Sequence, residues 1–253
     1  MSSTQGYPRI SIVTVVFNGA ATIEDTIKSV FSQHYPEIDY VIVDGGSTDG
    51  TVEIIKRYEA KISAWVSAPD NGIYDAMNKA LDMVSGDFVL FLGCDDLLWD
   101  ANVLSTAASR MVDRQLVYYG NVVMKKTGII YDGYFNKSKM ARKNICHQAI
   151  FYPVHLYRNN RYTLKYSLLS DYEYNLRLFD KFTYLDMIVS LFDDSGASSQ
   201  KADVVFIKDF HRLVVKHLGV MAYAAMAAYS LARRTRRALD IVKEGNYWKR
   251  EAK

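Results

Sequence analysis

GDFVLFLGCDD, residues 86–96, places an apolar run directly in front of two adjacent aspartates, Asp95 and Asp96. A run that is apolar at successive positions is typical of a strand buried on both faces, as in a parallel sheet. Both carboxylates would then emerge together at the carboxyl end of that strand. Because two like charges side by side repel each other, a divalent cation, an arginine or water has to lie between or above them.

The same pattern extends upstream, where short apolar runs alternate with segments of helical periodicity. This alternation is typical of βαβ units and a parallel sheet, so we predict an α/β fold for residues 10–112. The predicted strands are residues 9–17, 39–46, 62–68 and 86–92, and the predicted helices between them are residues 21–33, 51–60 and 72–84.

Each predicted strand is followed by a polar cluster. In open α/β sheets, ligands bind at the edge where the carboxyl ends of the strands meet. We therefore expect the four clusters to face one crevice. They read FNG (17–19), DGGSTDG (44–50), APDNG (68–72) and GCDD (93–96).

Composition limits what this crevice can be. With 253 residues, 49% of them hydrophobic, the chain can form one large domain, or one domain and an appendage. A net charge of +3 is too small to indicate nucleic acid as a partner. Two isolated cysteines, Cys94 and Cys146, exclude a disulfide framework or a cysteine-rich zinc site. The first residues lack the apolar core of a secretory signal, and the longest weakly polar run, 218–232, is shorter than the roughly 20 residues of a spanning helix. We expect a cytoplasmic protein.

Beyond residue 112 the sequence becomes mixed and rich in tyrosine. The pattern of residues 116–126 predicts two strands joined as a hairpin. Residues 147–152 are expected to form a further strand, and residues 170–182 a helix. From about Asp209 the chain has helical character, with basic residues on both sides of an Ala-rich apolar stretch. We predict a main domain over residues 1–208 and a basic and apolar helical tail over residues 209–253.

Two of the clusters have alternative interpretations. Adjacent aspartates at a strand end suit Mg²⁺ or Mn²⁺, but they also cap helices. VDGGSTDGT, residues 43–51, lacks both the GxGxxG fingerprint and the lysine of a P-loop, which disfavours a dinucleotide fold. Asp44 either hydrogen-bonds a nucleobase or ribose, or it belongs to a glycine turn. Phe17 either stacks on a base or packs in the core, and Asn18 closes its turn.

Together the four clusters resemble the family 2 glycosyltransferases, whose nucleotide-sugar-binding fold is called GT-A. The resemblance is dense over residues 9–100. GIYDAMNKA and HQAIFY look most like bacterial polysaccharide and colanic-acid-type members, which add a sugar to a lipid-linked oligosaccharide. It implies an α/β, GT-A-type nucleotide-binding fold with a mostly parallel central sheet flanked by helices, here followed by the tail. The segments that carry it, in order, are SIVTVVFNGAATIEDTIKSVFSQ, DGGSTDGT, DNGIYDAMNKAL and FLGCDD.

The resemblance also implies roles for individual residues. Asp95 would contact the ribose, and Asp96 would hold Mn²⁺ or Mg²⁺ on the diphosphate. Gly93 stands where the family often has a further acid, so this site has one acidic ligand fewer. The other residues implied to bind substrate are Thr14, Phe17 and Asp44 at the nucleobase, Asn18 in the first turn, Asp70 and Lys79 in the donor pocket, and His147 near donor or acceptor.

A catalytic base is implied further along the chain. LLSDYEYNLRL, residues 168–178, resembles the acidic motif that precedes an amphipathic helix ending in Arg in this family. Asp171 matches best and Glu173 is the second choice, although an aspartate at a helix start is often only a cap. With Asp171 as base, the family implies that the anomeric centre is inverted.

We therefore expect an enzyme that moves a sugar from a nucleoside-diphosphate sugar, UDP-linked rather than GDP-linked, to a lipid-linked saccharide in surface polysaccharide synthesis. Residues 209–240 either contact the inner face of the cell membrane peripherally or pack on the catalytic domain. Two alternatives stay open. One is a non-catalytic nucleotide-binding partner in a membrane-bound assembly, motivated by Gly93 and the basic tail. The other is a sugar nucleotidyltransferase, although FNGAATIED lacks the glycine-rich, basic loop that such enzymes use.

Overall fold

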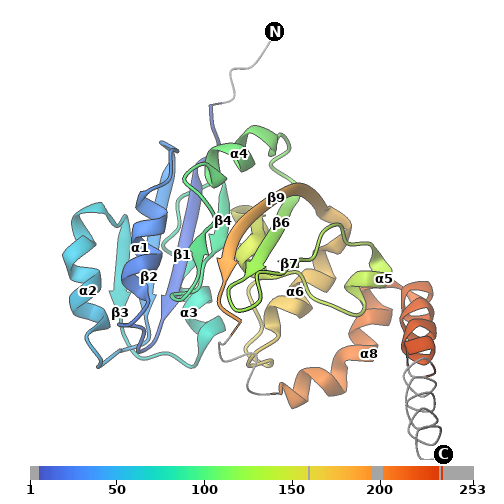
Figure 1. Ribbon diagram of the computed structural model, residues 1–253. Coiled ribbons are helices and arrows are strands. Elements are labelled where there is room, and N and C mark those ends of the chain that lie inside the picture. The colour runs from blue at the N-terminus through green and yellow to red at the C-terminus, as the bar shows by residue number, and fades with distance from the viewer. Residues whose placement is uncertain (1–5, 159, 195–201, 234, 236–253) are drawn as a thin grey trace, which may run out of the picture.

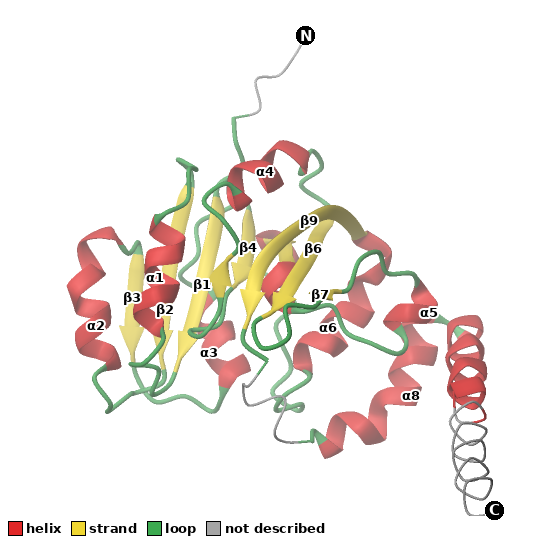
Figure 2. Ribbon diagram, in the orientation of Figure 1, coloured by secondary structure: helices red, strands yellow, loops and turns green. Residues whose placement is uncertain are grey.

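The structure is a computed structural model that describes residues 6–158, 160–194, 202–233 and 235. One twisted sheet crosses the molecule in the strand order β3-β2-β1-β4-β8-β6-β9-β5, and β7 pairs with β6 (Figure 1). Helices cover both faces of the sheet (Figure 2). The strands are β1 (Ile10–Val16), β2 (Ile38–Asp44), β3 (Ala64–Ser67), β4 (Phe88–Phe91), β5 (Leu97–Leu98), β6 (Val117–Met124), β7 (Ile130–Tyr131), β8 (Ile150–Pro153) and β9 (Phe182–Phe192).

The helices connect these strands in the expected βαβ manner through the first half and become irregular in the second. Four short 3₁₀ turns, counted over the described residues, supplement them: η1 (Glu59–Lys61), η2 (His147–Ala149), η3 (Val154–Tyr157) and η4 (Phe179–Lys181). The α-helices are α1 (Ile23–Phe31), α2 (Thr51–Tyr58), α3 (Ile73–Ala80), α4 (Val103–Arg110), α5 (Lys137–Met140), α6 (Ser170–Leu178) and α8 (Val204–Leu218), and a further helix covers residues 220–233.

The first half of the sheet follows the prediction. β3, β2, β1 and β4 are parallel neighbours, and all seven residues of β1 are buried. Side chains along β1 alternate between two cores, because successive residues of a strand point to opposite faces. Ile10 and Ile12 pack in the core that contains Ile27 of α1, whereas Val13 belongs to the core that contains Met77 of α3. This packing brings the predicted strand ends to one edge.

The second half differs from the prediction in two places. Residues 117–124 form one continuous strand, β6, so the hairpin predicted within residues 116–126 is wrong; β6 instead makes its hairpin with β7. β9 was not predicted as a strand, yet at 11 residues it runs parallel to β6 and antiparallel to β5. Its polar residues interrupt the apolar pattern, so only pairing with distant strands defines it as β structure. The α/β class is confirmed, with a sheet that is parallel through β4 and mixed beyond it.

A close approach of two backbones allows β6 and β9 to pair. At Gly120 the register between the strands shifts, and a Cβ atom there would lie only 2.7 Å from the carbonyl oxygen of Met187. Glycine is therefore required at this point. The pairing matters for function because it carries the end of β9 to the end of β4 (Figure 1).

The tail region packs on the rest of the chain through one side. Asp203 caps α8 by accepting a hydrogen bond from the backbone N–H of Phe206 at 3.0 Å. The predicted division between residues 208 and 209 falls inside α8, and RRTRR, residues 233–237, lies largely outside the described residues. Within the part of the chain that the structure describes, none of the helices has the length and hydropathy needed to cross a bilayer. The buried side chains of this region are Phe206, Leu213, Val214, Leu218, Ala222 and Met226.

Candidate active site

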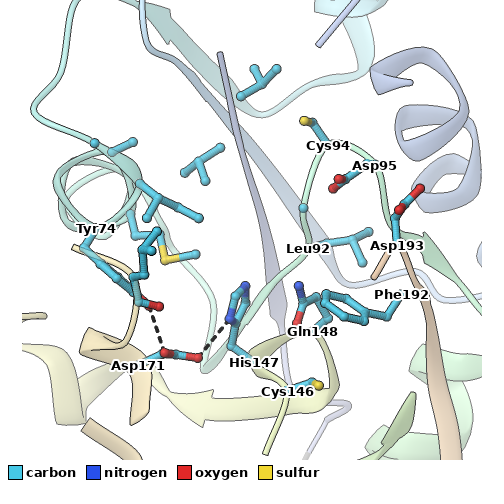
Figure 3. Close-up of a pocket in the computed structure, with 18 of the residues that line it drawn as sticks. Tyr74, Leu92, Cys94, Asp95, Cys146, His147, Gln148, Asp171, Phe192 and Asp193 are labelled. Carbon is cyan, nitrogen blue, oxygen red and sulfur yellow. Dashed lines mark hydrogen bonds and ion pairs between the residues drawn. The ribbon is translucent and has the colours of Figure 1, made fainter. Parts of the chain in front are cut away.

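A cavity of about 620 Å³ opens at the carboxyl ends of β1 and β4 and is closed by α3, η2, α6 and the end of β9. A volume of this size suits a small-molecule ligand of nucleotide dimensions. Both halves of the chain contribute to its wall (Figure 3). Its polar and aromatic lining residues, apart from two cysteines, are Phe17, Asp70, Tyr74, Asp95, Tyr131, Asn144, His147, Gln148, Ser167, Asp171, Phe192 and Asp193.

The polar cluster after β2 holds its own loop together. Asp44 is fully buried, and its Oδ2 accepts hydrogen bonds from the backbone N–H groups of Gly46 and Ser47 at 3.0 Å each. The hydroxyl of Ser67 on β3 donates to the same oxygen at 2.6 Å. Asn18 fixes the neighbouring turn, because its Oδ1 accepts from the backbone N–H of Thr48 at 3.0 Å. Asp44 and Asn18 thus shape the rim and do not line the cavity.

Of the four other residues predicted to contact the donor, two line the cavity and two do not. Phe17, 65% exposed, and Asp70 line the cavity. Thr14 is fully buried and its hydroxyl pairs with that of Tyr40 at 3.1 Å, because its side chain points into the sheet packing. Lys79 lies outside, where its Nζ is 3.1 Å from both a carboxylate oxygen of Asp75 and the carbonyl oxygen of Pro69. The structure therefore does not bring Thr14 or Lys79 to the cavity.

The two adjacent aspartates have different environments. Asp96 is 1% exposed; its Oδ2 accepts from the backbone N–H of Gly93 at 3.1 Å and its Oδ1 from that of Asp193 at 2.8 Å. Burial, and then the charge of Asp95, raises the pKa of Asp96 to about 6. A Cβ atom at position 93 would lie only 2.5 Å from Asp96 Oδ2. An acidic side chain at position 93 would therefore clash with the buried carboxylate of Asp96 as it is placed here. Asp96 joins the end of β4 to the end of β9.

Asp95 instead faces the cavity together with Asp193 (Figure 3). Burial raises the pKa of Asp95, and the charge of Asp193 adds to the increase, whereas Lys125 and His147 oppose it. Lys125 lies 3.4 Å from Asp193. These two carboxylates form an acidic end of the cavity. Among the residues that the structure describes, no group of three or more His, Cys, Asp or Glu is arranged to hold a metal ion.

Asp171 lies at the other end of the cavity and is 5% exposed. Its Oδ1 accepts from the Tyr74 hydroxyl at 2.8 Å and from the backbone N–H of Tyr172 at 2.8 Å. Its Oδ2 accepts from Asn144 Nδ2 at 3.0 Å and lies 3.2 Å from His147 Nδ1. Burial and the charge of Asp171 raise the pKa of Tyr74 far above its usual range, so this phenol stays a donor. Asp171 is therefore held rigidly.

Glu173, the second choice for the base, points elsewhere. It does not line the cavity; its Oε1 lies 3.1 Å from Arg177 Nε, within the same helix. Burial raises its pKa.

The cavity also contains two cysteines, Cys94 and Cys146. Burial raises the pKa of the Cys94 thiol to about 12 and raises that of Cys146 as well, so neither thiol is activated as a nucleophile.

Several cavity residues were absent from the predicted site, and Tyr74, Asn144 and Asp193 are those whose contacts shape its two ends. Asp193 had a readable signal, because LFDD at residues 191–194 repeats the arrangement of FLGCDD, an apolar run followed by two aspartates. Tyr74 sat within a quoted motif without a role. Asn144 carried no signal in the sequence, since only the folded chain places it beside Asp171.

Comparison with solved structures identifies the fold. The fold is similar to S. aureus TarS (residues 1–349) in complex with UDP-GlcNAc, with a TM-score of 0.67 at 19% identity over 87% of this chain and 71% of that one. It is also similar to the mannosyltransferase PcManGT from Pyrobaculum calidifontis in complex with GDP-Man and Mn²⁺, with a TM-score of 0.60 at 18% identity over 96% of this chain and 84% of that one. These similarities confirm the predicted GT-A-type fold.

Sequence comparison gives the family. Residues 11–170 match the model of "Glycosyl transferase family 2". A PGL/p-HBAD biosynthesis glycosyltransferase from Mycobacterium bovis is 32% identical over 213 residues, which are 79% of this chain and 83% of that protein. The putative teichuronic acid biosynthesis glycosyltransferase TuaG of Bacillus subtilis is 35% identical over 118 residues, 46% of each chain. The chain belongs to glycosyl transferase family 2 and is a nucleotide-sugar-dependent glycosyltransferase.

Proposed function

We propose that this glycosyltransferase transfers a sugar from a nucleoside-diphosphate sugar to a lipid-linked saccharide, with inversion of the anomeric centre, in surface polysaccharide or glycolipid synthesis. The observation that carries the proposal is one cavity with two chemically different ends, Asp95 with Asp193 at one and Asp171 with His147 at the other (Figure 3). Sugar transfer needs a stabilised leaving diphosphate and a base for the acceptor hydroxyl, held in line. Direct displacement between two such ends inverts the anomeric carbon.

A divalent cation fits the acidic end. Mg²⁺ and Mn²⁺ take oxygen ligands, and Mg²⁺ in particular uses one or two carboxylates while phosphates and water complete its shell. Asp95 and Asp193 would hold the ion; the sequence-based assignment gave this role to Asp96, but both oxygens of Asp96 accept backbone hydrogen bonds. When bound, the ion neutralises charge on the departing diphosphate. A similar fold has been solved with GDP-Man and Mn²⁺.

The donor's nucleoside would lie on the side of Phe17 and Asp70. The ring of Phe17 is exposed at the cavity, where a base can stack on it, and Asp70 accepts from the backbone N–H of Gly72 at 2.8 Å, which fixes its carboxylate beside the ring. Asp44 and Asn18 act indirectly, because they hold the loops that carry these two residues. We favour a UDP-sugar, as bound by TarS, over a GDP-sugar.

The proposal places residues 204–233 at a membrane surface, where a lipid-linked acceptor is found. Val204, Val205 and Ile207 of α8 are 44–58% exposed, and the same helix carries the exposed Lys208 and, further along, the exposed Lys216. Apolar side chains beside basic ones suit anionic lipid, each lysine contributing about 1 kcal/mol. The double substitution K208E/K216E should therefore weaken binding to phosphatidylglycerol vesicles by roughly tenfold or more, as measured by co-sedimentation. Equal binding of the wild type and the double variant to phosphatidylglycerol vesicles would contradict the membrane contact. Binding of the wild type only to phosphatidylcholine vesicles would contradict it as well.

The donor can be identified directly. A ligand that binds the native state raises the melting temperature by mass action. In a thermal-shift screen of UDP-glucose, UDP-galactose, UDP-N-acetylglucosamine and GDP-mannose, with and without Mn²⁺, we expect one sugar nucleotide to raise the melting temperature, and more so with Mn²⁺. Release of its nucleoside diphosphate in the presence of a lipid-linked saccharide, with an inverted linkage in the product, tests the reaction. A retained anomeric configuration would contradict the proposed displacement.

A further inference from the structure

A chain of hydrogen bonds leads from the middle of the sheet to Asp171. Tyr152 on β8 is fully buried and donates its hydroxyl proton to Asn175 Oδ1 at 2.6 Å. Asn175, also fully buried, donates from Nδ2 to Asn144 Oδ1 at 2.9 Å. Asn144 in turn donates from Nδ2 to Asp171 Oδ2 at 3.0 Å. Neither Tyr152 nor Asn175 lines the cavity, so the chain reaches the carboxylate from the protein interior.

The direction of each amide in this chain is fixed at both ends. Burial raises the pKa of Tyr152 far above its usual range, so this phenol keeps the proton that it donates to Asn175. At the other end, an amide oxygen turned toward Asp171 would face the negative charge of the carboxylate, and therefore Asn144 presents its NH₂ group there. Turning over either amide alone would place two acceptors or two donors against each other. Asn144 thus meets Asp171 in one orientation.

The second oxygen of Asp171 is held by other elements. The hydroxyl of Tyr74 on α3 donates to Asp171 Oδ1 at 2.8 Å and lies 2.9 Å from the carbonyl oxygen of Leu168, just before α6 (Figure 3). The backbone N–H of Tyr172 donates to the same Oδ1 at 2.8 Å. Because both oxygens have donors, the carboxylate cannot rotate without breaking at least one hydrogen bond.

We infer that Asn144 and Asn175 position Asp171 as the base of the transfer reaction, Asn144 by direct contact and Asn175 through Asn144. The inference rests on the proposed function. In that reaction the proton of the acceptor hydroxyl moves to Asp171 while the hydroxyl oxygen bonds to the anomeric carbon. The bond from that carbon to the diphosphate oxygen breaks, and its electron pair leaves with the nucleoside diphosphate.

Positioning matters because a general base works only within hydrogen-bonding reach of the hydroxyl. A displacement of about 1 Å caused by a change far from the reacting atoms can cost on the order of 10²-fold in rate. The chain of hydrogen bonds through Asn175 and Asn144 opposes such a displacement of Asp171. Both amides are neutral, so they orient the carboxylate without adding a positive charge that would weaken it as a base.

The test substitution is N175L, because Asn175 lies behind the cavity wall and leucine, of similar size, makes no side-chain hydrogen bonds. The matched control is N121L. Asn121 is a buried asparagine on β6 that donates to the Tyr184 hydroxyl at 2.8 Å and accepts from the backbone N–H of Gly133 at 2.7 Å, and none of these three residues lines the cavity.

Release of UDP or GDP is measured from UDP-N-acetylglucosamine, UDP-glucose and GDP-mannose with Mn²⁺, with octyl β-glucoside or octyl β-galactoside as acceptor. We expect N175L to lose roughly 10- to 100-fold in kcat per folded molecule, with the KM for the donor within about threefold of the wild type. N121L should stay within about threefold in both constants, although both variants should lower the melting temperature. A kcat of N175L within threefold of the wild type, or an equal loss in N121L, would overturn the inference.

A double-mutant cycle separates positioning from a general loss of stability. If Asn175 acts through Asn144, adding N175L to N144A should cost less than about threefold in kcat, although N175L alone costs 10- to 100-fold. The same cost of N175L in the wild type and in N144A would show that Asn175 does not act through Asn144.

The side-chain amide of Asn144 gives a readout that does not depend on turnover. Its ¹H–¹⁵N signal, identified by its loss in N144A, should move in D171N and in N175L but not in N121L. An unchanged signal in N175L would refute the chain of hydrogen bonds. If the wild type releases no nucleotide from any donor, the proposed function fails, and the amide signal still tests whether Asn175 orients Asn144 toward Asp171.

Discussion

In the half of the sheet built from β3, β2, β1 and β4, buried carboxylates hold loops, whereas residues that follow β8 and β9 bring carboxylates to the cavity. Asp44 and Asp96 both accept from backbone N–H groups through their oxygens, but Asp171 and Asp193 line the cavity wall. Asp70 and Asp95 are the exceptions in the first half, since both line the cavity and Asp95 lies close to Asp193 of the second half. The position of an acid at a strand end does not define its role. What its oxygens accept does.

The sharpest test of this contrast is D95N. Removing the charge that faces the diphosphate, while keeping the shape of the side chain, should lower the transfer rate on the order of 10³-fold with the melting temperature almost unchanged. Steady-state release of nucleoside diphosphate and a melting curve provide the two measurements. Should D95N retain most of its activity, the acidic end would not act on the leaving group.

D96A should show the opposite signature. Deleting this carboxylate leaves the buried N–H groups of Gly93 and Asp193 without their acceptor, which should destabilise the fold by about 3 kcal/mol. Denaturant unfolding measures this loss, and activity should fall mainly with the folded fraction. A stable D96A protein with no activity would instead support the role of metal ligand first predicted for Asp96.

D193N addresses whether the second half supplies a ligand. With one carboxylate fewer at the acidic end, we expect roughly a tenfold to 100-fold rise in the Mn²⁺ concentration needed for half-maximal activity. Loss of a residue that supports a metal site commonly lowers metal affinity by about that factor. A Mn²⁺ titration of activity checks it, with D194N as the neighbouring control because Asp194 does not line the cavity. Equal Mn²⁺ requirements in D193N and wild type would restrict the ion to Asp95.

E173Q should change catalysis least, within about threefold, because Glu173 faces Arg177 and not the cavity. The substitution should mainly change the free energy of unfolding. Burial raises the pKa of Glu173 in the folded state, so its contribution is fully present below the ordinary pKa of glutamate and is lost as the pH rises through the raised value. The unfolding free energy of the wild type minus that of E173Q should thus decrease as the pH rises from about 4. An increase of this free-energy difference with pH would contradict the predicted direction.

The first half of the fold was predictable because its signals are local. The apolar runs of β1, β2 and β4 are buried on both faces, and helices between them follow a 3.6-residue period, so short windows contain the information. β9 shows the opposite case. Its residues carry no clear period, and its strand character comes from pairing with β6 and β5, which lie far away in the sequence.

The candidate site divides in the same manner. Asp95, Phe17, Asp70, His147 and Asp171 could be named from their motifs, and the cavity gathers all five. Thr14 and Asp44 stood in equally good motifs, but sequence spacing cannot tell a carboxylate or hydroxyl that faces solvent from one that closes its own turn. That distinction depends on where the neighbouring strands place donors and acceptors.

The sequence by itself determined the α/β class, the family and the edge of the sheet at which the acids gather, because these follow from local periodicity and short motifs. Only the tertiary structure decided that Asp96 is buried while Asp95 faces the cavity, that β9 brings Asp193 to the same end, and that Tyr74, Asn144 and His147 surround Asp171. Hydrogen bonds between groups about 25 to 100 residues apart exist only once the chain has folded, so no local pattern encodes which oxygens remain open to a substrate.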